Sequence, residues 1–159
     1  MLNKVRYLRE VYTDKLRLLN PLEKPRWGKM NPAQMVDHMI YSFQLANGKI
    51  NVEQLLTKED QVPRMQEWLI SPKAMKENFI NPLIPLDPPE PRNNNFEESI
   101  GALQNEIEDM IDFFAKRPGI KLLNPFFGEL DYKLYVNLLY KHALHHLRQF
   151  GIEEAYIED

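Results

Sequence analysis

Apolar residues recur at steps of three and four positions in four long stretches of this chain, and a helix-ending residue follows each stretch. This spacing puts the apolar side chains on one face of an α-helix, so it predicts helices that pack against one another. The stretches cover residues 2–19, 32–46, 96–116 and 131–150. Asparagine, proline or glycine closes every one of them within two positions. We find no strand-like alternation, and the sequence therefore predicts an all-α fold, a four-helix bundle.

Two of the predicted helices have well-marked ends. Asn31 is a suitable N-cap, and Pro32 suits the first helical position because its missing N–H would have no partner there. Asp131 suits the N-cap of the last helix, and Gly151 suits the position just after its end. These residues predict where the second and last helices begin and end.

A long proline-rich connection separates the second and third main helices. Residues 52–70 are amphipathic but weaker, and we expect Pro63 to bend or restart a helix there. Residues 71–95 contain six prolines, so beyond a short helix over 73–79 we predict a long loop. Two interpretations of this loop stay open: it covers one end of the bundle, or it is a solvated connector.

Three of the four histidines lie within five consecutive positions of the last predicted helix. His142 and His146 are four positions apart, so they point to one side of the helix and could bind one metal ion together. His38, the only other histidine, falls on the second predicted helix. We therefore predict a three-histidine metal site between these helices. Three protein ligands leave positions for water or substrate, as in catalytic or ligand-binding centres.

Other polar residues beside this site have alternative roles. His145 could replace His146 as a ligand, although packing or a hydrogen bond near the site is the preferred interpretation. Gln149 could orient a ligand or close the helix end, and an ordinary surface position is the alternative. Glu106 and Asp109 could hydrogen-bond the imidazoles, but we prefer a charged outer face for both. No residue is assigned as a catalytic base.

Two known helical metal motifs do not match the histidine run. A zinc-protease helix needs a glutamate directly after its first histidine, and Ala143 stands there. Di-iron bundles need a glutamate three positions before each histidine ligand, and those positions hold Met35, Leu139 and Ala143. Both classes are therefore excluded.

The composition of the chain limits the kinds of partner and metal ligand that it can have. The 159 residues suit a single domain over 1–159, and a net charge of −3 gives no basic field that would gather nucleic acid. The chain has no cysteine, so nitrogen and oxygen atoms must hold any metal. Charges near the N-terminus argue against a signal peptide, and no apolar run has the length of a membrane span. We expect a cytoplasmic protein without a membrane or nucleic-acid partner.

Three motifs together resemble the DinB-like (YfiT-like) superfamily, and most closely one of its less characterised branches. They are Trp27–His38, Asn124–Leu130 and Lys141–Phe150. The resemblance implies an up-down-down-up four-helix bundle that holds a divalent metal, often zinc or nickel, with His38, His142 and His146. Two positions depart from the pattern of the branch. Asn124 stands where a histidine is common, and Tyr135 stands where a tryptophan is common.

The resemblance also implies a class of reaction. Relatives of this kind include metal-dependent transferases that use low-molecular-weight thiols, and we expect such a thiol S-transferase with a small-molecule substrate. A metal-dependent hydrolase is an alternative. Another is a metal- or ligand-binding bundle without catalysis, acting through a partner or as a homodimer. In the last alternative the histidines bind nothing and the chain is a plain helical protein.

Overall fold

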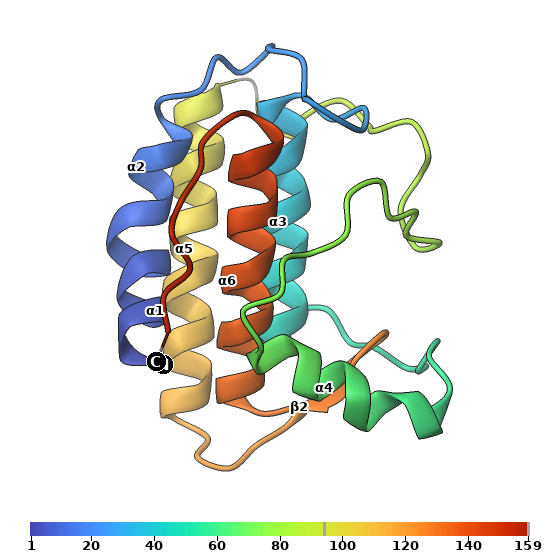
Figure 1. Cartoon of the computed structure of the whole chain (residues 1–159). Coiled ribbons are helices and arrows are strands. Elements are labelled where there is room, and N and C mark those ends of the chain that lie inside the picture. Colours follow the sequence, from blue (N-terminus) through green and yellow to red (C-terminus); the bar gives the residue numbers. More distant parts are fainter. Residues whose placement is uncertain (94, 159) are drawn as a thin grey trace.

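The computed structural model describes residues 1–93 and 95–158 and is predominantly helical (Figure 1). The first helical segment comprises α1 (Leu2–Arg6), a π-helical turn (Tyr7–Val11) and α2 (Tyr12–Leu16). It ends earlier than the predicted 2–19 helix, because the amides of Leu18 and Leu19 bond three residues back and tighten the chain into turns. Leu18, beyond that end, is 74% exposed.

Helix α3 (Pro32–Ala46) has the predicted boundaries. The Asn31 side chain accepts from the Gln34 amide at 2.9 Å, and the Gln34 side chain accepts from the Asn31 amide at 3.0 Å. This reciprocal capping box satisfies two backbone N–H groups that the first turn leaves unpaired. Gly48 follows the helix with φ +76°, a conformation that favours glycine.

The last two long helices also match their predicted ranges closely. Helix α5 spans Phe96–Ala115 and α6 spans Tyr132–Gln149. Asp131 caps α6 as predicted, accepting from the Leu134 amide at 2.9 Å. Gly151 has φ +86° just beyond the end of α6, which confirms its predicted place.

The long helices lie side by side, with α3 packed against α5 and α6, and α6 packed against α1 and α2 (Figure 1). Figure 1 shows α3 and α5 running in the same direction, while α2 and α6 run in the opposite one. Parallel neighbours cannot be joined by a short turn, so the long segment between α3 and α5 carries the chain back. The completely buried side chains include Leu8, Tyr12, Met35, Met39, Phe43, Ile100, Leu103, Ile107, Tyr135 and Tyr140.

The returning segment contains a 3₁₀ turn (Glu59–Gln61) and α4 (Val62–Ile70). Pro63 lies in the first turn of α4, so the predicted restart is confirmed. The predicted helix over 73–79 is wrong. Asn78 has φ +56°, and the carbonyl oxygens of Ser71 and Lys73 accept from the Lys141 ammonium group instead of from helical amides.

A short hairpin precedes α6 and corrects the expectation of no strands. Strands β1 (Leu122–Asn124) and β2 (Gly128–Leu130) pair antiparallel. Three residues are too few for alternation to be visible in a sequence. The Asn124 side chain closes the turn by accepting from the amides of Phe126 at 3.0 Å and Phe127 at 3.2 Å. Asn124, one of the two residues that depart from the DinB-like pattern, therefore has a local structural role.

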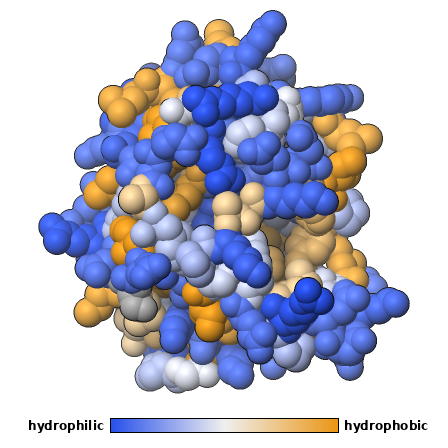
Figure 2. All heavy atoms as spheres, in the orientation of Figure 1, coloured by the Kyte–Doolittle hydropathy of each residue, from blue (hydrophilic) through white to orange (hydrophobic). Residues whose placement is uncertain are grey.

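The surface in Figure 2 is largely hydrophilic, with apolar side chains scattered among charged ones. The proline-rich segment contributes several exposed apolar residues, including Phe79, Ile80 and Leu86. Within the residues that the structure describes, no helix combines the length and apolar character needed to cross a bilayer.

Candidate metal centre

Three histidines from two helices meet between α3 and α6. The Nε2 atom of His142 lies 2.9 Å from His38 Nε2 and 2.9 Å from His146 Nε2. Each of the three histidines offers one ring nitrogen as a ligand atom, and these three nitrogens all lie within 4.8 Å of one another. The group could therefore hold a metal ion. The predicted convergence of His38 with the two histidines of α6 is therefore confirmed, although 104 positions separate His38 from His142.

The side chain of Gln149 determines which nitrogen of His146 carries the proton. Its Nε2 donates to the Trp27 carbonyl oxygen at 2.7 Å, so its Oε1 is the atom that faces His146 Nδ1 at 2.8 Å. An amide oxygen can only accept, and Nδ1 must therefore be the donor. The Nε2 atom of the neutral ring is left with a lone pair directed toward the other two histidines.

Protons alone do not satisfy this arrangement. If His142 Nε2 carries a proton, it can donate a well-aligned hydrogen bond to His38 or to His146, each 2.9 Å away, but not to both. A cation among the three nitrogens would meet a lone pair from each ring. The ligand nitrogens of a tetrahedral zinc site lie about 3.3 Å apart, given Zn–N bonds of about 2.0–2.1 Å. The donor set therefore fits a divalent ion after small ring movements.

The surroundings keep the imidazoles neutral, which is the form that binds metal. Burial lowers the pKa of His38 to about 4, with a smaller contribution from His145. Burial and the neighbouring imidazoles hold the pKa values of His142 and His146 well below their usual range. At neutral pH the rings therefore present lone pairs and not positive charges. Neutral imidazole suits zinc, nickel, copper and iron alike.

The two neighbouring polar residues of α6 have distinct roles. His145 is not a member of the group; its ring packs edge-on against Trp27 at 5.5 Å and against His146 at 5.0 Å between centroids. These ring contacts agree with packing, one of the two preferred interpretations for His145. Gln149 is 3% exposed and hydrogen-bonded to His146, so the surface alternative is wrong.

The connector before α3 forms part of the site, which the sequence did not indicate. Besides the Trp27 carbonyl, the Arg26 amide donates to the Gln149 backbone oxygen at 2.8 Å. Gly28 has φ +75°, and a β-carbon there would lie 3.0 Å from Gln149 Nε2. A side chain at Gly28 would thus press on the amide that orients His146. The sequence signal for this connector was the motif Trp27–His38, which begins with Trp27 and Gly28.

The acidic residues of α5 do not support the histidines. Glu106 is buried, which corrects its expected place on an outer face. It accepts from Gln44 at 3.0 Å and from Asn47 at 2.7 Å, near the end of α3. Lys49 bridges Glu106 at 2.8 Å and Asp109 at 2.5 Å. Asp109 is half-exposed and fits the predicted charged face.

The proline-rich loop is fastened to the first turns of α3, just before His38. Gln34 Nε2 donates to the carbonyl oxygens of Pro88 at 3.3 Å and Pro89 at 3.1 Å. The Arg92 amide donates to Asp37 at 2.7 Å. Asp37 therefore anchors the loop backbone. The loop lies against the helix that carries His38, which agrees more with a cover than with a free connector.

Fold and site together define a predominantly helical protein with a three-histidine group able to hold a metal ion. Comparison of the chain with family models, with curated proteins and with solved structures finds no match. The resemblance to a family therefore depends on the three sequence motifs alone.

Proposed function

We propose that this chain is a divalent-metal-binding member of the DinB-like superfamily, built as an up-down-down-up four-helix bundle. The single observation that carries the proposal is the meeting of three Nε2 atoms, with each ligand atom within 4.8 Å of the others. The helix directions in Figure 1 and the three sequence motifs support the family and the bundle. Zinc or nickel is the expected ion, because the resemblance implies these two metals and neutral imidazoles suit both.

The chain's own residues hold and orient the proposed centre. His38, His142 and His146 are the ligands, and Gln149 keeps the proton of His146 on Nδ1, away from the ion. When bound, the ion would act as a Lewis acid and make a thiol or a water molecule nucleophilic near neutral pH. Three protein ligands leave open positions for that molecule.

We propose that the reaction joins a low-molecular-weight thiol to a small electrophile: the thiol sulfur loses its proton, forms a bond to the electrophilic carbon and displaces a leaving group from that carbon. The alternative is a binder without catalysis. It is favoured by two cavities within the described residues, one beside the tail after α6 and one beside the β1–β2 hairpin, because His38, His142 and His146 line neither of them. Hydrolysis is the third possibility, since the same centre would activate water.

Metal content tests the centre itself. Protein purified without a histidine tag should contain about one divalent ion per chain by mass spectrometry, and His142→Ala should lose it. The matched control is His145→Ala, which removes a histidine that lies outside the group and should keep the ion. Equal metal content in all three proteins would refute the site.

Activity assays then separate the three functions. Metal-loaded protein is incubated with a panel of cellular thiols and a chromogenic electrophile, and separately with a panel of activated esters. Thiol conjugation that stops on chelation and in His142→Ala supports the transferase. Ester cleavage with the same dependence supports the hydrolase. Retained metal with neither activity supports the binder.

A further inference from the structure

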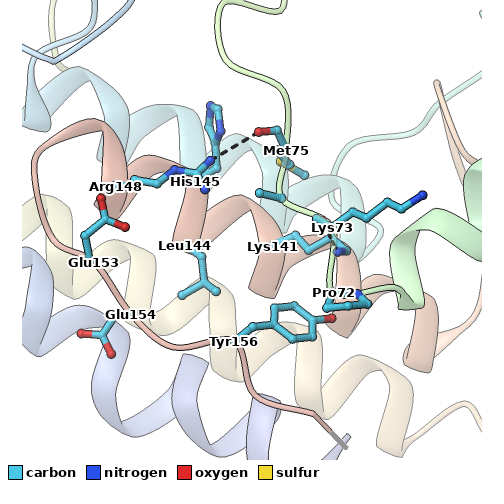
Figure 3. Close-up of a pocket in the computed structure, with 11 residues that line it drawn as sticks. Pro72, Lys73, Met75, Lys141, Leu144, His145, Arg148, Glu153, Glu154 and Tyr156 are labelled. Atoms are coloured by element: carbon cyan, nitrogen blue, oxygen red, sulfur yellow. Dashed lines mark hydrogen bonds between the residues drawn. The ribbon is translucent and has the colours of Figure 1, made fainter.

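A cavity of about 200 Å³, separate from the three-histidine group, lies on the side of α6 that faces the C-terminal tail (Figure 3). Its walls come from α6, from the segment after α4 and from the tail beyond α6. The apolar part of the wall consists of Pro72, Ala74, Met75, Leu144 and Tyr156. The volume corresponds to roughly six or seven water molecules, enough for a small organic compound. No residue of the three-histidine group lines it.

The charges around this cavity are unevenly paired. Its two carboxylates are bound to cations outside the cavity wall, Glu153 to Arg26 at 3.4 Å and Glu154 to Lys15 at 2.7 Å. Arg148 has no carboxylate partner among the described residues; its guanidinium donates to the Met75 carbonyl oxygen at 3.3 Å. The cavity therefore retains an uncompensated positive charge on Arg148.

Two buried polar atoms of this wall have no hydrogen-bond partner among the described residues. They are Arg148 Nε and His145 Nδ1, which lie one turn apart on α6; the interaction of the His145 ring with the Met75 backbone leaves Nδ1 without a well-formed hydrogen bond. Both can donate, since a guanidinium Nε always carries a proton and a neutral imidazole can carry one on either nitrogen. A buried donor without an acceptor is costly, so an acceptor from outside the chain would stabilise the wall.

We propose that this cavity binds a small organic carboxylate. The carboxylate lies against Arg148 and His145, where a guanidinium and an N–H can donate to its two oxygens. The carbon skeleton packs against Met75, Leu144 and the Tyr156 ring. This apolar wall favours an organic acid over inorganic phosphate, which has no surface to bury there. The site is separate from the proposed metal centre and does not rest on it.

Benzoate and butyrate are suitable probes, with benzamide and butyramide as neutral controls of the same shape. Binding is followed by shifts of amide and methyl signals in two-dimensional NMR spectra of the full chain. A neutral chelator, 1,10-phenanthroline, is present throughout, because a carboxylate could otherwise bind a metal at the histidines. We expect the acids, but not the amides, to shift the signals of Met75, Leu144 and Arg148.

Three variants test the proposed contacts. Arg148→Met should raise the Kd for benzoate by about tenfold or more, because the charged donors are lost. Glu153→Gln should lower that Kd, since it removes a negative charge from the wall at an exposed position where folding is not at risk. Lys133→Met is the matched control, because it removes the same charge from an exposed position of α6 that does not line the cavity, and the Kd should not change.

Each contrary result overturns the proposal in a defined way. Equal binding of acids and amides would remove the role of charge. Phosphate that binds as tightly as benzoate would remove the role of the apolar wall. Absence of any shift with millimolar benzoate in the folded protein would mean that the cavity does not bind small carboxylates. An unchanged Kd in both Arg148→Met and Glu153→Gln would place the acid elsewhere.

Discussion

Gln149→Met is the sharpest test of how the histidine group is built. Methionine keeps the length of the side chain but removes both hydrogen bonds of the amide, to His146 Nδ1 at 2.8 Å and to the Trp27 carbonyl oxygen at 2.7 Å. Each buried group left without a partner costs about 1–3 kcal/mol, so the metal-free protein should lose about 2–6 kcal/mol of unfolding free energy.

Metal affinity should fall as well, because His146 is no longer held with its Nε2 lone pair toward the ion. Loss of such an outer hydrogen bond typically weakens metal binding by about 10–100-fold. That range corresponds to about 1.4–2.8 kcal/mol of binding free energy. The assay is competition for zinc against a chromophoric chelator at neutral pH, in parallel with urea unfolding of the metal-free protein.

Gln104→Met provides the control, because Gln104 is also partly buried and also donates and accepts. It contacts Thr13 at 3.0 Å and the Arg9 carbonyl oxygen at 3.1 Å, on the interface of α5 with the first helical segment. This variant should lose stability without losing metal affinity. An unchanged zinc affinity in Gln149→Met, or an equal loss in Gln104→Met, would refute the orienting role of Gln149.

Three further outcomes follow from the same contacts. Gly28→Ala should lower the unfolding free energy by about 1–2 kcal/mol through its positive φ and also weaken zinc binding, because its β-carbon would lie 3.0 Å from the orienting amide. The control is Gly119→Ala, which should lower stability only, because Gly119 has φ +81° and no atom lies within 4 Å of the added carbon. Equal zinc affinity of the Gly28 and Gly119 variants in the competition assay would contradict the effect of the Gly28 contact with Gln149. Glu106→Gln should lower the unfolding free energy in urea by about 1.5–3 kcal/mol, because it weakens buried charged hydrogen bonds. Asp109→Asn, at a half-exposed ion pair, should lower it by under about 1 kcal/mol. A larger loss for Asp109→Asn than for Glu106→Gln would contradict the difference in burial. Free zinc at 100 times its Kd should stabilise the protein against urea by about 2.7 kcal/mol, and chelation should reverse the gain; a chelator-insensitive midpoint would show that the folded chain binds no zinc.

The helices were predictable because their signals are local. The capping box at Asn31, the cap at Asp131 and the glycine at 151 each act within one turn, so the residue types alone indicate where α3 and α6 begin or end. The pairing of His142 with His146 is equally local, since it follows from four-residue spacing on one helix. Only the approach of His38 to His142 and His146 depends on tertiary packing.

The support of Gln149, the burial of Glu106 and the hairpin were not predicted, because they depend on main-chain atoms and tertiary contacts that residue types do not reveal. The acceptor that fixes Gln149 is a main-chain carbonyl of Trp27, and every residue has such a carbonyl. Glu106 looked like an outer-face carboxylate because its neighbours on α5 are charged, yet the side chains that follow α3 reach across and bury it. The hairpin is too short for a period, and its turn depends on the Asn124 side chain.

A metal ion in this site would join parts of the chain that are far apart in sequence. His142 and His146 can approach one ion in any helical segment, but His38 is 104 positions from His142 and reaches it only when α3 is packed on α6. Bringing such distant residues together in an unfolded chain costs about 4 kcal/mol of loop-closure entropy, from the logarithmic dependence on loop length. The folded protein has already closed that loop, so the third imidazole adds affinity only in the folded state. The centre would therefore link the connector around Trp27, helix α3 and helix α6 into one unit whose stability depends on the ion.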